Sequence, residues 1–303
     1  MSLSVALVSA RAAHGLDEDM PPLLAAFAAA GAAAQIVDWD DSAVDWARFD
    51  VALLRSTWDY TDRLAQFLAW VGRTAALTRL QNPASVVRWN CDKHYLLGLS
   101  AAAVPIVAST FAEPGEEPAQ VLAEFLARHD CAELVVKPAV GAGSRDTRRH
   151  ARTATGEIVP HMQALLAAGR SVLLQPYLAA IDRDGETALI YIAGRFSHAI
   201  RKGPLLPPEA AATAALFAAE DIRPRRAADD ELALGARVLA QLPFKELLYA
   251  RVDLIRDNRG APCLLELELT EPSLFFTHAA GSAERFATLV LNYPLNGGPQ
   301  GAR

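Results

Sequence analysis

The chain has 303 residues, of which 52% are hydrophobic and 21% are charged, so it carries enough apolar material for two or three compact units. Its formal net charge of −6, without a long basic tract, excludes nucleic acid as an expected partner. The three cysteines show no CxxC spacing, which argues against a disulfide framework or a zinc site and fits a reducing compartment. Neither a signal peptide nor a membrane-spanning stretch is evident, so we expect a cytoplasmic protein without a membrane partner.

The first third of the chain alternates between short strands and helices. The pattern predicts strands at 5–9, 34–37 and 51–54, with helices at 23–30 and 64–77. Strand–helix–strand alternation at this spacing predicts an open parallel sheet. In such a sheet ligands bind beyond the carboxyl ends of the strands, so the loops at those ends hold the candidate binding residues.

Two loops follow the predicted strand ends, at 10–19 and 55–60. Their polar and charged side chains are candidates for substrate binding, although surface loops carry such residues routinely. Trp58 and Tyr60 fit either core aromatics or pocket walls. The candidates for substrate binding in these loops are Arg11, Asp17, Arg55, Ser56, Thr57 and Asp59.

Asn82-Pro83 interrupts the alternation and ends the first domain. We therefore predict three domains, at 1–88, 89–176 and 177–303. The second is predicted to hold helices at 92–102 and 119–128 and strands at 104–105, 133–137 and 171–175. The third is predicted to hold a turn at 182–185, a hairpin of 187–192 and 196–200, a loop with a short helix at 203–228, strands at 247–255 and 263–269, and helices at 231–241 and 282–291.

A loop of small residues follows a β-branched strand in the second domain. The strand ends in Lys137-Pro138, and the loop at 141–145 reads Gly-Ala-Gly-Ser-Arg. Glycines let backbone N–H groups approach an anion, and the lysine supplies a positive charge. A Walker loop has its lysine after the glycines, so the order here indicates a different nucleotide site, with the loop closing over the phosphates. Taken alone, Lys137 also fits a surface lysine at a strand end.

Two neighbouring strands near the C-terminus carry charged residues at alternate positions. Arg251 and Asp253 share one face of the first strand, and Glu266 and Glu268 share one face of the second. Carboxylates between aliphatic residues are costly unless they are paired or metal-bound, and their oxygens suit Mg²⁺. The alternative is a solvated outer sheet face, which is less expected for two adjacent strands with the same pattern.

Read in chain order, these residues resemble the ATP-grasp superfamily, in the pattern of glutathione synthetase and the RimK-type amino-acid ligases. The resemblance runs from about 82 to 273 and adds Lys93 and the segment Gln175-Pro176-Tyr177-Leu178. The segment 54–60, Leu-Arg-Ser-Thr-Trp-Asp-Tyr, resembles the subgroup of D-cycloserine-forming cyclo-ligases. The implied fold is α/β (α+β), with a Rossmann-like N-terminal domain and two subdomains that enclose the nucleotide between their sheets.

The resemblance implies a role for each matched residue. The cofactors are ATP and Mg²⁺, with two ions expected and Mn²⁺ able to substitute; Asp253, Glu266 and Glu268 would hold the metal. Arg251 would stabilise the transferring phosphoryl group. Arg201 and Lys202 are not part of the matched pattern; their place at the end of a predicted strand suggests that they bind a substrate carboxylate or an acyl phosphate. Ser273, in the loop after the metal strand, would contact the acceptor substrate. The nucleotide-binding residues would be Lys93, Lys137, Gly141, Ala142, Gly143, Ser144, Gln175, Tyr177, Leu178 and Glu186.

The sequence departs from the family pattern at two positions. Glu186-Thr187-Ala188 stands where the family has Asp-x-Arg, and Glu268 stands where it usually has asparagine. The missing arginine removes a cation near the ribose or phosphates. The extra carboxylate adds negative charge beside the metal, which would tighten Mg²⁺ or repel phosphate.

We therefore expect an ATP-dependent carboxylate–amine ligase that forms an acyl phosphate on a small amino-acid-like substrate. Two versions remain open: ligation to an amine partner, and cyclisation of a single O-ureido-serine-type molecule. A homodimer is one expected state, since dimers are common among related ligases. The departures also keep two other classes open, a nucleotide-binding regulator without turnover and a small-metabolite kinase.

Overall fold

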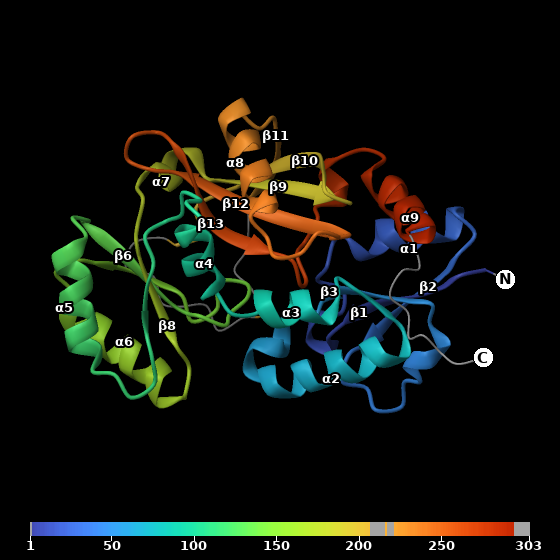
Figure 1. The fold of residues 1–303 in the computed structure, drawn as a ribbon, viewed down its shortest axis with the longest axis horizontal. Coiled ribbons are helices and arrows are strands. Elements are labelled where there is room, and N and C mark those ends of the chain that lie inside the picture. Colours follow the sequence, from blue (N-terminus) through green and yellow to red (C-terminus); the bar gives the residue numbers. More distant parts are fainter. Residues whose placement is uncertain (1, 207–215, 217–220, 294–303) are drawn as a thin grey trace.

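The computed structural model describes residues 2–206, 216 and 221–293, which form three β-sheets (Figure 1). The N-terminal sheet contains β1 (Ser4–Ser9), β2 (Ala33–Asp38), β3 (Val51–Ser56) and β4 (Arg79–Gln81), all parallel in the order β2-β1-β3-β4. Helices α1 (Met20–Ala29) and α2 (Leu64–Leu77) lie between its strands in the chain. The predicted parallel sheet is confirmed.

The second sheet is antiparallel and has two helices packed on one face. It contains β5 (Thr110–Ala112), β6 (Glu133–Pro138), β7 (Arg148–Ala151) and β8 (Val172–Pro176), in the order β5-β8-β6-β7. Helices α5 (Pro118–Arg128) and α6 (Thr155–Ala167) cover one face (Figure 1). Leu134 and Val136 pack into the core under these helices, so alternation turns Val135 and Lys137 to the opposite face.

The third sheet is also antiparallel and carries the acidic strands. It contains β9 (Glu186–Ile192), β10 (Arg195–Lys202), β11 (Ile222–Arg225), β12 (Tyr249–Arg256) and β13 (Pro262–Glu268), in the order β11-β10-β9-β12-β13. Helix α8 (Asp229–Ala240) packs on one face of it through Leu234 and Val238. A Cβ at Gly235 would lie 2.3 Å from the Tyr191 hydroxyl, so glycine permits this close approach of helix and sheet.

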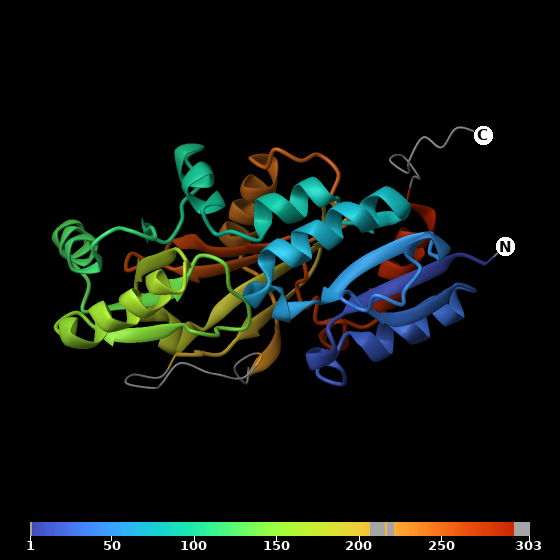
Figure 2. The same ribbon diagram turned by 90° about the horizontal axis from the view of Figure 1, so that it is seen from below.

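The N-terminal and third sheets share one continuous core. Helix α9 (Ser282–Asn292) packs beside α1, as Figures 1 and 2 show. Val5 and Phe27 of the N-terminal unit belong to the same cluster as Ile190 and Phe286. The strands of the three sheets lie within 4–81, 110–176 and 186–268, whereas α9 packs back against the first of these units. The domain limits at 1–88, 89–176 and 177–303 stay a prediction.

Several predicted elements differ from the observed ones. The predicted helix 92–102 is α4 (Tyr95–Ala101), preceded by the unpredicted α3 (Ala84–Asn90). Residues 104–105 form no strand; only an isolated bridge joins Ile106 to Leu264. Residues 182–184 of the predicted turn at 182–185 belong to α7 (Ala180–Asp184). Residues 222–225 form strand β11 rather than a loop. The rest of the predicted loop and short helix at 203–228 lies largely outside the described residues.

Short 3₁₀ helices complete the described elements at η1 (Arg11–Ala13), η2 (Trp46–Arg48), η3 (Trp58–Asp62) and η4 (Phe276–His278). No helix in the described part of the chain is long and apolar enough to cross a lipid bilayer. All three cysteines are free thiols.

Candidate active site

A pocket of about 280 Å³ lies between the second and third sheets and extends to the loops of the N-terminal sheet. Val135 and Lys137 line one wall, because they occupy the face of β6 that α5 and α6 leave open. Glu266 and Glu268 of β13 line the opposite wall. Trp58 and Tyr60 close the end that faces the N-terminal sheet. Residues from all three sheets therefore meet around one space.

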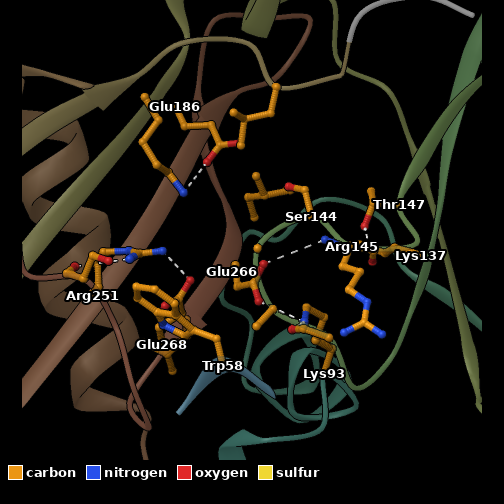
Figure 3. A pocket seen from close by; sticks show the side chains of 18 of the residues that line it. Trp58, Lys93, Lys137, Ser144, Arg145, Thr147, Glu186, Arg251, Glu266 and Glu268 are labelled. Carbon is orange, nitrogen blue, oxygen red and sulfur yellow. Dashed lines mark hydrogen bonds and ion pairs between the residues drawn. The ribbon is translucent and has the colours of Figure 1, made fainter. Parts of the chain in front are cut away.

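Two lysines converge on one carboxylate at the centre of this pocket (Figure 3). Lys93 Nζ lies 3.0 Å and Lys137 Nζ 4.0 Å from carboxylate oxygens of Glu266. The Lys93 ammonium also donates to the carbonyl of Gly141 at 2.8 Å, which ties it to the small-residue loop. Burial lowers the pKa of Lys137 more than the adjacent Glu266 raises it. The arrangement presents two cations to an anionic ligand.

The small-residue loop lies over these lysines and lines the pocket from Gly141 to Arg145. Gly143 and Ser144 both adopt a positive φ, 62° and 59°, so the backbone turns sharply there. The Arg145 guanidinium lies 2.7 Å from the Asp62 carboxylate, which anchors the loop to the N-terminal unit. A loop held at one side over two lysines suits a cover for phosphates.

The segment after β8 forms the far end of the pocket. Gln175, Tyr177 and Leu178, which the family resemblance assigns to nucleotide binding, line it. The Tyr177 N–H already donates to the Glu133 carbonyl at 2.9 Å. Backbone contacts to a base at this end would therefore come from other groups of the segment.

A largely buried ionic network lies on the third sheet, and its members Glu186, Lys202 and Arg251 line the pocket. Lys202 Nζ lies 2.7 Å from Glu186 and 2.6 Å from Asp253, and Arg251 Nε lies 2.9 Å from the other oxygen of Asp253. Although burial raises the pKa of Asp253, Arg251 and Lys202 outweigh it and hold that pKa at about 2. Lys202 belongs to β10, next to β9, which carries Ala188 in place of the expected arginine. Lys202 of β10 and Arg251 of β12 therefore place positive charge on the strands either side of Ala188, where the family has an arginine.

Two carboxyl groups in the pocket have strongly raised pKa values. Burial, together with Asp253 and Glu266, raises the pKa of Glu268 to about 7 even though Arg251 forms an ion pair with it. Burial, and then the charge of Glu268, raises the pKa of Glu271 to about 8. Both groups therefore exchange protons near neutral pH, as groups at reactive sites often do.

The three predicted metal ligands meet on adjacent strands, where Asp253 is the register partner of Glu266 and Arg251 that of Glu268. Hard carboxylate oxygens from Glu266 and Glu268 face the pocket and fit Mg²⁺ chemically. Asp253 is almost fully buried and is not among the lining residues. Within the described residues no three acidic, histidine or cysteine side chains surround a common point; each predicted ligand contacts a lysine or arginine.

Most of the predicted substrate residues lie outside the pocket lining. Only Asp17 and Ser273 line it. Arg11 is exposed, Ser56 hydrogen-bonds to Ser9 at 2.9 Å, and Thr57 is buried. Asp59 accepts from the Trp39 indole at 2.8 Å, and Arg55 is buried against Asp19.

The two adjacent residues proposed to bind a carboxylate also separate. Lys202 lines the pocket, whereas Arg201, its neighbour on β10, points to the other side. Arg201 Nε donates to the Asp184 carbonyl at 2.8 Å and lies outside the lining.

Comparison with known proteins identifies the chain. Residues 5–82 match a family model described as the N-terminal domain of D-cycloserine synthetase DcsG. The cycloserine biosynthesis protein DcsG of Streptomyces lavendulae is 41% identical over 293 residues, covering 93% of this chain and 96% of that protein. The chain belongs to the ATP-grasp ligase family that includes DcsG. The predicted enzyme class, a ligase that forms C–N bonds with ATP, is confirmed.

Solved structures of ATP-grasp ligases show the same fold. A crystal structure of D-cycloserine synthetase DcsG superposes with a TM-score of 0.90 at 39% identity, covering 95% of this chain and 99% of that one. The ATP-grasp ligase PsnB, with bound minimal precursor, reaches 0.65 at 17% identity and covers 96% and 99%. D-alanine–D-alanine ligase from Bacillus anthracis reaches 0.67 at 14% identity and covers 96% of both chains. The predicted ATP-grasp fold is confirmed, and the family uses ATP and Mg²⁺.

Sequence reasoning in this ATP-grasp ligase missed part of the pocket wall. Glu271 and Phe275 line it but were not among the candidate site residues, whereas Trp58 and Tyr60, which the sequence left open as core aromatics or pocket walls, do line it. In the loop that follows β13, the sequence analysis predicts an acceptor contact for Ser273 and none for Glu271, which lies two residues earlier. The signal that pointed to Glu271 was its place directly after the acidic strand β13.

Proposed function

We propose that this ATP-grasp ligase converts the carboxylate of a small amino-acid-like substrate to an acyl phosphate and closes the same molecule on itself. The convergence of Lys93 and Lys137 on Glu266 in a pocket that reaches the N-terminal loops carries the proposal. The similarity to DcsG over almost the whole chain supports cyclisation of an O-ureido-serine type of substrate, which gives cycloserine once water removes the carbamoyl group from the ring nitrogen. Ligation to a separate amine is the version that this similarity disfavours.

Each group of residues has a proposed task. Lys93, Lys137 and the loop 141–145 bind the triphosphate, and the segment 175–178 with Glu186 holds the nucleoside. Arg251 and Lys202 neutralise charge on the transferring phosphoryl group. Asp17 and Ser273 contact the substrate at the end of the pocket that faces the N-terminal sheet.

ATP supplies the phosphoryl group, and Mg²⁺ neutralises its charge during transfer. We propose two Mg²⁺ ions, replaceable by Mn²⁺, held by Glu266 and Glu268, which line the pocket. Asp253 would serve as a third ligand by turning from Arg251 and Lys202 toward the pocket. The acidic pair on β13 supports this proposal. We further propose a homodimer in the cytoplasm, by analogy with related ligases; the mass measured by light scattering tests the dimer.

The deciding experiment measures ADP and phosphate release with Mg-ATP and O-ureido-serine, with and without hydroxylamine, which traps acyl phosphates as hydroxamates. We expect ADP release that depends on the substrate, a hydroxamate in the trapped reaction, and cycloserine in the untrapped one. Lys137→Ala and Glu266→Gln should each abolish turnover. A stable phosphorylated product would show a kinase instead, and binding of Mg-ATP without ADP release would show a regulator.

A further inference from the structure

Glu271 is a pocket carboxyl group that forms no ion pair with any lysine or arginine of the described residues. Its side chain is 7% exposed, and it lines the pocket directly after β13. Glu186, Asp253, Glu266 and Glu268, the carboxyl groups on β9, β12 and β13 around it, each form an ion pair with a lysine or arginine. Within the described chain no ion pair reaches Glu271.

The backbone around Glu271 is held rigidly from the N-terminal unit. The Trp58 indole N–H donates to the Glu271 carbonyl at 3.3 Å, and Arg55 Nη2 donates to the Pro272 carbonyl at 2.8 Å. One carboxylate oxygen of Asp19 accepts from the N–H groups of Leu274 and Phe275, at 2.5 and 3.1 Å. The side chain is therefore presented from a fixed loop, which a group that acts on substrate requires.

The surroundings of Glu271 place it at the junction between the phosphate site and the substrate end. Its electrostatic neighbours are Glu268, Tyr60, Lys93 and Glu266. Lys93 and Glu266 lie where the triphosphate is proposed to bind. A purely structural role is poorly explained, because an amide would fill the same space without the cost of burying a carboxyl group.

We propose that Glu271 is a catalytic residue that accepts the proton of the nitrogen attacking the acyl phosphate. This inference rests on the proposed function. The nitrogen forms its bond to the acyl carbon, the bond from that carbon to the phosphate oxygen breaks, and the electron pair leaves with phosphate. The N–H proton passes to the Glu271 carboxylate, so the ring-closed amide is neutral and charge is conserved. With O-ureido-serine this product still carries the carbamoyl group on its ring nitrogen, and hydrolysis of that group to carbon dioxide and ammonia then gives cycloserine.

The local chemistry suits a proton acceptor. Burial and Glu268 raise the pKa of Glu271 to about 8, while Tyr60 and Lys93 lower it, so proton exchange falls close to neutrality. A general base acts most effectively when its pKa lies near the working pH. Phosphoryl transfer from ATP to the carboxylate releases no proton from a nitrogen and should not need Glu271.

Glu271→Gln separates the two half-reactions. With O-ureido-serine and Mg-ATP, we expect hydroxamate formation in the presence of hydroxylamine within about twofold of the wild type. Cyclisation without hydroxylamine should fall at least about 100-fold, the usual contribution of a general base. Glu284→Gln, an exposed acidic residue on α9, is the matched control and should leave both rates unchanged. A wild type that yields no hydroxamate would instead contradict the proposed function itself.

Two results for Glu271→Gln would overturn the inference: cyclisation within about tenfold of the wild type, or an equal loss of hydroxamate and cyclised product. Glu271→Ala gives an independent readout if the glutamine variant does not fold. Formate added to this variant should restore cyclisation at least about tenfold more than chloride does, because it returns a carboxylate to the vacated space. Equal rates in the two salts would also overturn the inference.

Discussion

Arg55 and Asp19 form an ion pair that is almost fully excluded from solvent, with 3.1 Å between Nη2 and Oδ2 and side chains 0% and 2% exposed. Arg55 lies near the C-terminal end of β3, and Asp19 directly precedes α1. Both also bond to the backbone of residues 272–276, across more than 200 positions of sequence. The pair therefore fixes the loop that carries Glu271 and Ser273 against the N-terminal sheet.

Asp19→Asn should destabilise the protein strongly. Removing one charge of a buried pair leaves the other uncompensated, so we expect the free energy of unfolding to fall by about 3–5 kcal/mol. Urea-induced unfolding followed by circular dichroism measures the change. Glu124→Gln breaks an exposed pair with Arg128 on α5 and should cost less than about 1 kcal/mol. Similar losses for the two variants would show that the buried pair does not hold the loop.

Local sequence patterns were sufficient for the elements that carry the nucleotide site. The apolar run before Lys137 and the alternation around Asp253 and Glu266 depend on neighbouring residues only, and the structure brings them together. Strand β7 was missed because Arg148–Ala151 reads Arg-Arg-His-Ala, without apolar alternation. Strand β5 has three residues, too few for a periodic signal.

Contacts between distant segments were beyond the reach of sequence patterns. The position of Arg55 at a strand end suggested a substrate contact, yet its partners Asp19 and Pro272 come from other parts of the chain. Lys202 and Arg201 are adjacent in sequence, and only the register of β10 shows which one faces the pocket. Such roles depend on strand register and packing, which a single sequence does not specify.

Lys137→Met should remove a charge that the triphosphate needs while preserving side-chain length. We expect kcat/KM for ATP to fall about 10²–10³-fold, the usual loss when one stabilising donor is removed from a buried site. Initial rates of ADP release against ATP concentration measure it. Lys245→Met, at an exposed position, is the matched control and should change the rate less than twofold, about the error of such comparisons. Equal effects of the two substitutions would show that Lys137 does not bind the phosphates.

Glu268→Asn restores the residue usual in the family and tests the metal proposal. The amide has one oxygen and no charge, so we expect the Mg²⁺ concentration for half-maximal ADP release to rise at least about tenfold. The KM for ATP should not rise, because a negative charge beside the phosphates is removed. The rates are measured at fixed ATP over a series of Mg²⁺ and Mn²⁺ concentrations. An unchanged metal requirement would exclude Glu268 as a ligand.

Glu271 should make the stability of the free protein depend on pH. Its pKa is about 8 in the folded protein and about 4.5 for the unperturbed group, so between these values the folded state holds a proton that the unfolded chain has lost. The free energy of unfolding should therefore fall as the pH rises from 4.5 to 8, by at most about 1.4 kcal/mol per pH unit from this group.

Above pH 8 the contribution of Glu271 should level off, because both states are then ionised. Glu271→Gln has no proton to lose, so its melting temperature should exceed that of the wild type by a margin that grows from pH 5 to pH 8. Melting curves of both proteins across that range, without nucleotide, measure the margin, and Glu284→Gln should follow the wild type. A constant difference between Glu271→Gln and the wild type would mean that Glu271 is already ionised in the folded protein at pH 5.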